Sequence, residues 1–400
     1  MNSELSSFAA RLREIISIAS REGREAVKFP SHPSRSSRAI SEREFSDLAL
    51  ELFALQFKHN SAYRKICEVR QLTPTTVKHW TQIPAVPTAA FKELELTSLA
   101  PDERTAVFHS SGTTEQKPSR HFHSAESLVV YEASLWQSFE QNVSEARGVG
   151  RGALGLVMLT PPPALVPHSS LVHMFETVRQ KFDAPKAAFV GKLADDGAWS
   201  LDFEATLASL SPRAPRPAPQ ALLVLGTAFS FVHLLDELVE RDMRVELPSG
   251  SRVMETGGYK NRSRVLPKAE LHALIADRLG VPLENIICEY GMSELSSQAY
   301  DGEARGFRRE TLGCNASHPK PTASRRFHFP PWARVQIISP ETGREVAEGE
   351  TGLIRIFDLA NVFSVAAIQT EDLGVRRGYG FELVGRAQLA EPRGCSLMTA

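Results

Sequence analysis

From about Thr105 onward, short apolar runs alternate with helix-length amphipathic segments, and this alternation limits the fold more than any other feature of the 400-residue chain. The short runs are rich in Val, Ile and Leu. Such alternation is typical of an α/β domain built on a largely parallel sheet. The expected strands are Thr105–His109, Ala153–Leu159, Ala221–Leu225, Arg252–Met254 and Asn285–Cys288. The expected helices lie near Ala125–Glu140, Ser169–Lys181, Phe229–Arg241 and Lys268–Leu279.

The two ends of the chain have different patterns. Near the start, Leu5, Phe8 and Leu12 recur at helical spacing, and a second amphipathic run begins near Glu42. After Pro331 the expected elements are short strands. We therefore expect a helical N-terminal region (1–100) packed on the core, an α/β core (101–330), and a β-rich subdomain with a tail (331–400). A partner-binding helical arm is the alternative for the first part.

Charge and cysteine content narrow the class of protein. The formal net charge of −1 argues against a partner held mainly by charge, such as bulk nucleic acid or an anionic membrane. The four cysteines show no zinc-site spacing, which favours free thiols in a reducing compartment. No apolar run approaches the roughly 20 residues needed to span a bilayer, and the N-terminus lacks an apolar signal region. We therefore expect a cytoplasmic protein.

A run of hydroxyl-bearing residues around Gly112 follows the first expected strand and precedes a helix. Gly112 permits close backbone approach, so that successive N–H groups can surround phosphate oxygens, and Lys117 can neutralise a leaving pyrophosphate. The residues expected to contact phosphate are Ser110, Ser111, Gly112, Thr113 and Thr114. The order differs from the Walker pattern. A polar turn between strand and helix is the alternative interpretation.

Three later segments accompany this loop: Tyr290-Gly-Met-Ser-Glu294, Thr370-Glu-Asp-Leu-Gly374 and Gly385-Arg386. With the four segments in this order, the sequence resembles the adenylate-forming superfamily of acyl-CoA ligases, luciferases and adenylation domains. Within that superfamily it is most similar to phenylacetate–CoA ligases and to the acyl-protein synthetase family of the bacterial luminescence fatty-acid reductase. The segments that carry this closer likeness are Ile83–Thr88, Phe91-Lys92, Thr256–Lys260, Gly385-Arg386 and Arg393–Leu397.

The resemblance implies an adenylate-forming α/β fold that uses ATP and Mg²⁺, and it implies a role for individual residues. Tyr290 would border adenine, Asp372 would accept hydrogen bonds from the ribose, and Arg386 would contact ribose or phosphate. A carboxylate suits Mg²⁺ when phosphates complete the shell of the ion. The implied nucleotide-binding residues are Tyr290, Gly291, Ser293, Asp372 and Arg386, and Glu294 is the implied metal ligand.

Each of these residues also has a structural interpretation. Tyr290 would then be a buried core tyrosine, and Glu294 a solvated glutamate at a helix start. Asp372 would be a turn residue, and Arg386 a surface arginine in a β-turn.

Two features depart from the usual pattern of the superfamily. Glu115 stands where the phosphate loop usually has a second glycine, which puts a negative charge near polyphosphate. The chain also continues for only 14 residues after Arg386, where CoA ligases carry a mobile C-terminal domain with a lysine that assists adenylation. The expected fold therefore lacks that domain.

Cys395, in Arg393-Gly-Cys-Ser-Leu397, matches the position of the acyl-accepting cysteine of the acyl-protein synthetases. A thiolate is a good nucleophile toward a mixed anhydride. The sequence thus predicts activation of a fatty acid as acyl-AMP, with Glu294 and Lys117 assisting, and transfer to Cys395 for delivery to an acyl reductase. The alternatives are an acyl- or aryl-CoA ligase, a non-catalytic nucleotide-binding scaffold and, for Cys395 alone, an incidental exposed thiol.

Overall fold

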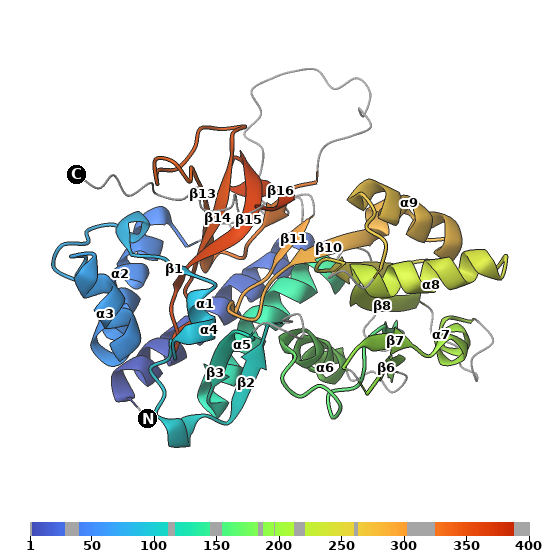
Figure 1. The fold of residues 1–400 in the computed structure, drawn as a ribbon, viewed down its shortest axis with the longest axis horizontal. Coiled ribbons are helices and arrows are strands. Elements are labelled where there is room, and N and C mark those ends of the chain that lie inside the picture. The colour runs from blue at the N-terminus through green and yellow to red at the C-terminus, as the bar shows by residue number, and fades with distance from the viewer. Residues whose placement is uncertain are drawn as a thin grey trace, which may run out of the picture.

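The computed structural model describes residues 2–28, 40–110, 117–144, 154–182, 187–195, 197–211, 221–259, 263–301 and 325–387. These residues form one 12-stranded sheet and two small two-stranded sheets, with helices on both sides (Figure 1). The α/β fold expected from the sequence is therefore confirmed.

Five parallel strands form one half of the large sheet, in the order β10-β9-β8-β4-β5. Four of them coincide with expected strands, and only β5 was not expected. Their bounds are β4 (Leu154–Met158), β5 (Ala187–Phe189), β8 (Ala221–Thr227), β9 (Arg252–Thr256) and β10 (Ile286–Tyr290).

The central strands are buried on both faces, which is why they read as continuous apolar runs. In β8, Leu222 and Val224 pack with helices α8 and α9, while Leu223 and Leu225 pack with α5 and α6 on the other face. Figure 1 shows α8 lying along β8, with α9 next to α8. The helix bounds are α5 (Ala125–Phe139), α6 (Ser170–Phe182), α8 (Ala228–Glu240) and α9 (Lys268–Leu279), close to those expected.

Antiparallel strands extend the same sheet beyond β10, in the order β11-β12-β16-β15-β14-β13, so the sheet as a whole is mixed. Short β1 pairs in parallel with β15. The strands near the C-terminus thus continue the large sheet, while the division of the chain at residues 100 and 330 stays a prediction. The bounds are β1 (Val86–Pro87), β11 (Ala299–Asp301), β12 (Phe327–His328), β13 (Ala333–Ile338), β14 (Thr351–Asp358), β15 (Ala367–Arg377) and β16 (Gly380–Arg386).

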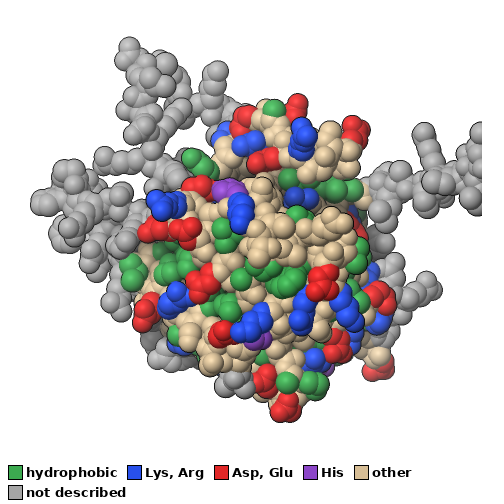
Figure 2. Space-filling view, turned by 90° about the vertical axis from the view of Figure 1, so that its left-hand side faces the viewer, with side chains coloured by type: hydrophobic (Ala, Val, Ile, Leu, Met, Phe, Trp, Pro, Cys, Tyr) green, Lys and Arg blue, Asp and Glu red, His purple; other side chains and the backbone are tan. Residues whose placement is uncertain are grey.

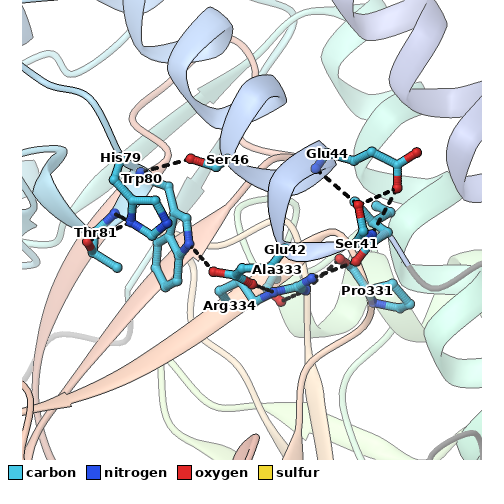
Figure 3. A network of polar contacts seen from close by, with 11 residues as sticks. Ser41, Glu42, Glu44, Ser46, His79, Trp80, Thr81, Pro331, Ala333 and Arg334 are labelled. Atoms are coloured by element: carbon cyan, nitrogen blue, oxygen red, sulfur yellow. Dashed lines mark hydrogen bonds and ion pairs between the residues drawn. The ribbon is translucent and has the colours of Figure 1, made fainter.

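Three helices at the N-terminus pack on β13–β15 and β1 through a shared apolar cluster. They are α1 (Ser3–Lys28), α2 (Glu42–His59) and α3 (Ser61–Val69). Helix α2 begins at a capping box formed by Ser41 and Glu44. The next residue after the cap, Glu42, accepts a hydrogen bond from Trp80 Nε1 at 2.5 Å and pairs with Arg334 of β13 at 3.6 Å (Figure 3). Polar contacts therefore also fix α2 to the sheet.

The remaining described elements are short. They are α4 (Ala90–Glu93), α7 (Phe203–Leu210), the hairpin of β6 (Gly191–Leu193) and β7 (Trp199–Leu201), a π-helical turn at Glu140–Ser144, and 3₁₀ turns at Trp80–Gln82, Pro101–Glu103 and Leu283–Asn285.

The expected strand before the phosphate loop lies outside the large sheet. It forms β2 (Ala106–His109), which pairs antiparallel with β3 (Arg120–His123) alone. The loop thus follows a strand and precedes a helix as expected, but β3, which was not expected, lies between the loop and α5. Residues 111–116 of the expected phosphate loop lie outside the described residues.

On the face shown in Figure 2, the described Lys and Arg side chains are interspersed with Asp and Glu and form no large patch of one sign. No helix among the described residues combines the length and the apolar character needed to cross a bilayer.

Candidate active site

A pair of serines, called the hairpin base, lies next to the last strand pair of the β2–β3 hairpin, where its loop begins. The Ser119 amide donates to Ser110 Oγ at 3.0 Å, and the Ser110 amide donates to the Ser119 carbonyl at 3.4 Å. Ser110 is the one expected phosphate-loop serine that the structure describes, because Ser111, Gly112, Thr113 and Thr114 lie outside the described residues. Its hydroxyl accepts a hydrogen bond from the hairpin and still has a proton to donate.

The segment Tyr290–Glu294 begins with the last residue of β10, at the carboxyl end of the parallel strands, where ligands bind in open α/β sheets. Gly291 leaves room for the carboxylate of Glu289, which would have to move if a Cβ atom were added at this position. Tyr290 is 7% exposed, and its ring packs edge-on against Phe327 and Phe381. Part of its surface therefore belongs to the core, as the structural interpretation expects.

The phenol of Tyr290 also joins this segment to β15. It donates a hydrogen bond to Oδ2 of Asp372 at 2.9 Å. The other carboxylate oxygen of Asp372 lies 3.9 Å from Nε of Arg386, its neighbour on β16. Burial raises the pKa of Asp372, whereas the Tyr290 hydrogen bond and the Arg386 charge oppose the rise. Asp372 lies inside a strand, so its interpretation as a turn residue was wrong.

Glu294 is 4% exposed, which rules out a solvated glutamate. Burial raises the pKa of its carboxyl, and the nearby Ser119 hydroxyl and the charges of Lys92 and Arg386 lower it. Glu294 thus lies next to the base of the phosphate-loop hairpin and within reach of the charge of Arg386. The β2–β3 hairpin and Asp372 thus both bond to the segment Tyr290–Glu294, the hairpin through Ser293 and Asp372 through Tyr290.

Ser293 uses its hydroxyl within the protein. Its Oγ donates to the carbonyl of His109 at 2.9 Å, and its own carbonyl accepts from His121 Nδ1 at 2.8 Å. This explains why a hydroxyl residue suits the position, because it ties the loop to the hairpin.

Lys117, expected to act on pyrophosphate, has its ammonium 3.3 Å from Glu93, and both side chains are more than half exposed. The sequence predicted no role for Lys92 and Ser119, which act on the Glu294 carboxyl, or for His121, which bonds to the neighbouring Ser293. The Phe91-Lys92 pair was visible as part of the family likeness. Ser119 and His121 gave no local signal, since their contacts to this loop are long-range.

The donors around Glu294 suit a magnesium ion that is bound together with phosphates. A carboxylate and a hydroxyl supply hard oxygen ligands. The described residues contain no group of three or more His, Cys, Asp or Glu that could form a metal site by themselves. Mg²⁺ keeps most of its water and phosphate ligands when it binds to proteins. The residues present therefore suit a magnesium ion that binds together with ATP and has one carboxylate ligand from the protein.

The two cysteines in the described part of the chain are poor nucleophiles. Cys67 and Cys288 are buried. Burial raises the pKa of Cys67 to about 11 and holds that of Cys288 well above its ordinary value. Cys314 and Cys395 lie outside the described residues.

Solved adenylate-forming ligases share the fold. A 2-hydroxyisobutyryl-CoA ligase in the postadenylation state, in complex with 2-HIB-AMP, matches with a TM-score of 0.61 and 13% identity, over 87% of this chain and 69% of that chain. An open conformation of the same ligase, with 2-HIB-AMP and CoA, matches with a TM-score of 0.59 and 14% identity, over 87% and 71% of the two chains. At these identities the likeness establishes the fold alone.

Curated relatives match over nearly the whole length. The long-chain-fatty-acid–luciferin-component ligase of Aliivibrio fischeri is 24% identical over 373 residues, which cover 90% of this chain and 89% of the relative. The protein of the same name from Vibrio harveyi is 24% identical over 369 residues, covering 88% and 86%. The family described as "Acyl-protein synthetase, LuxE" matches residues 11–400. With nearly the full sequence matched, this chain belongs to the LuxE family of acyl-protein synthetases.

Proposed function

We propose that the protein activates a long-chain fatty acid with ATP and Mg²⁺ and transfers the acyl group to its own Cys395. The observation that carries this proposal is the meeting of Glu294, the hairpin base at Ser110 and Ser119, and the Tyr290–Asp372 pair at one end of the sheet. The long-chain fatty acid is the substrate that the names of the two curated relatives give.

The first step is adenylation. A carboxylate oxygen of the acid attacks the α-phosphorus of ATP, and the bond to the β-phosphate bridging oxygen breaks to release pyrophosphate. The residues around Gly112 would bind the phosphates, and Glu294 would hold Mg²⁺, which would offset negative charge on the phosphates. Asp372 has one oxygen held by Tyr290, which leaves the other to accept hydrogen bonds from the ribose.

The second step is acyl transfer. The Cys395 thiolate attacks the carbonyl carbon of acyl-AMP, and the bond to the phosphate oxygen breaks to release AMP. Burial and the raised pKa of Cys67 and Cys288 make these two thiols unsuitable for the attack. This supports Cys395, which the family likeness selects, as the acceptor.

The acyl thioester would then serve an acyl reductase that takes the group from Cys395. A reaction that consumes ATP and needs a free thiol fits the reducing conditions of the cytoplasm. We therefore propose this location as well.

A labelled-acid experiment tests both steps. The protein is incubated with Mg·ATP and a series of labelled fatty acids of different chain length, and samples are run on denaturing gels with and without hydroxylamine, which cleaves thioesters. We expect label on the wild type that hydroxylamine removes, and no label on Cys395→Ser. Matched controls are Cys67→Ser and Cys288→Ser, which should keep the label in their folded fraction.

Pyrophosphate exchange and CoA separate the alternatives. We expect acid-dependent exchange in both the wild type and Cys395→Ser, because only the second step needs the thiol. Equal labelling of Cys395→Ser, or acyl-CoA as the product with no protein label, would contradict the transfer to Cys395. Absence of exchange with every acid would contradict adenylation itself.

A further inference from the structure

Ser293 joins the loop that carries Glu294 to both strands of the β2–β3 hairpin. Its carbonyl accepts a hydrogen bond from Nδ1 of His121 on β3 at 2.8 Å. Its hydroxyl donates to the carbonyl of His109 on β2 at 2.9 Å. One residue therefore fixes the position of Glu294 relative to both strands of this hairpin.

In the hydrogen bond between His121 and the Ser293 carbonyl, the histidine is the donor. A carbonyl oxygen can only accept, so Nδ1 of His121 carries the proton. The ring is 2% exposed, and burial lowers its pKa to about 4, so the imidazole is neutral and has a single N–H. The rings of Phe91 and His123 lie 6.4 Å and 4.3 Å away between centroids. The orientation of the donor is thus fixed by packing.

Other residues hold the far side of the same loop. Asn361 Nδ2 donates to the carbonyl of Glu294 at 2.8 Å. Asp358 accepts from the Ser296 amide at 2.9 Å and from Ser297 Oγ at 2.7 Å. The far side therefore stays anchored when a hydrogen bond on the hairpin side is removed, so that a change there shifts the loop without releasing it.

We propose that His121 is a positioning residue that sets Glu294 for the magnesium ion bound with ATP. It acts through the carbonyl of Ser293, and it makes the geometry of the metal ligand depend on the hairpin that binds the phosphates. The inference rests on the proposed function, in which Glu294 holds the ion. Groups that orient a metal ligand without touching the metal affect metal affinity by about 10–100-fold.

Two substitutions at His121 separate the hydrogen bond from the packing. His121→Asn loses the ring but keeps an N–H donor near the position of Nδ1, whereas His121→Leu keeps the bulk and has no donor. His123→Leu is the matched control, because this neighbouring buried histidine contacts Ser127 instead of the loop. Calorimetry measures the affinity for ATP across a magnesium titration and in EDTA, and amide hydrogen exchange of residues 290–296 is recorded without ligand.

We expect His121→Leu to need about tenfold more magnesium for half-maximal ATP affinity and to exchange faster at residues 290–296. Its ATP affinity in EDTA should match that of the wild type. His121→Asn should lie close to the wild type in both readouts, and His123→Leu should leave the magnesium requirement unchanged even where its melting temperature falls.

Other outcomes overturn the inference. Equal changes in His121→Leu and His121→Asn would assign His121 to packing, and an equal magnesium effect in His123→Leu would do the same. A wild type that binds Mg·ATP but shows no acid-dependent exchange would contradict the proposed function and leave the His121 comparison valid. A wild type whose ATP affinity does not depend on magnesium would contradict both.

Discussion

Tyr290 donates a hydrogen bond from its phenol to the carboxylate of Asp372, and the two residues are 82 positions apart in the chain. One lies at the end of the parallel half of the sheet and the other in β15 of the antiparallel half. The bond therefore joins the expected adenine and ribose positions across the sheet. Tyr290 is both a core residue and a positioning group for Asp372.

Tyr290→Phe should weaken ATP binding more than it weakens the fold. The ring keeps its packing, whereas the largely buried carboxylate of Asp372 loses a donor, which costs about 1–3 kcal/mol. We expect the KM for ATP to rise by about tenfold or somewhat more. Initial-rate exchange kinetics measure this effect. An unchanged KM for ATP would place Asp372 away from the nucleotide.

Glu294→Gln should reduce adenylation without destabilising the protein. Burial disfavours the charged carboxylate, so a neutral side chain of the same shape should leave thermal stability equal or higher. Loss of the charged magnesium ligand should lower the exchange rate by at least about a hundredfold. Differential scanning fluorimetry and exchange rates are measured on the same sample. Exchange at the wild-type rate in this variant would assign the metal to another residue.

Glu289 should make stability depend on pH. Burial raises the pKa of this carboxyl to about 7 from an ordinary 4.5, against the hydrogen bond donated by Thr256. Between these values the folded protein binds more protons than the unfolded chain, so stability falls as pH rises from about 4.5 to about 7. The size of the effect is on the order of 3 kcal/mol.

Glu289→Gln removes this titration and is the direct check. We expect the melting temperature of the variant to change less than that of the wild type between about pH 4 and about pH 8, which lie on either side of the window from about 4.5 to about 7. The difference in melting temperature in favour of the variant should be greatest at the higher pH. Parallel pH profiles for the two proteins would show that Glu289 does not titrate in this range.

Gly385→Ala should strain the β15–β16 hairpin beside Arg386. Gly385 has φ = 143°, a conformation that L-residues rarely adopt, although no atom of the described residues lies within 4 Å of a Cβ built there. The cost is therefore backbone strain, about 1–3 kcal/mol by chemical denaturation. Gly378→Ala, in the same hairpin at φ = 59°, should cost only about 1 kcal/mol. Equal losses of unfolding free energy in the two variants would contradict the assignment of the Gly385→Ala effect to the unusual φ of Gly385.

The sequence could predict the central strands because burial on both faces leaves a continuous apolar run, as in β8 (Ala221–Thr227). It could not reveal β3, whose four residues Arg-His-Phe-His look polar. The burial of His121 in this strand comes from the loop at Ser293, 172 positions away. Long-range docking of this kind leaves no local pattern.

The features of the candidate site likewise include some that the sequence could predict and some that it could not. Residue identities at Tyr290, Glu294 and Asp372 followed from motif order, and the structure brings these segments together. The internal use of the Ser293 hydroxyl and the strand location of Asp372 were not predictable, because each depends on partners supplied by distant elements. The proposed roles of the residues toward ATP stay predictions.

The central claim is that ATP and the acid react at the place where Glu294, the hairpin base and Asp372 meet. Fatty-acid-dependent exchange of labelled pyrophosphate into ATP tests it most directly, measured on the wild type, Asp372→Asn and Cys395→Ser. We predict exchange in the wild type and in Cys395→Ser, and a strong loss in Asp372→Asn. Undiminished exchange in Asp372→Asn, or none in a folded wild type with any fatty acid, would contradict the account.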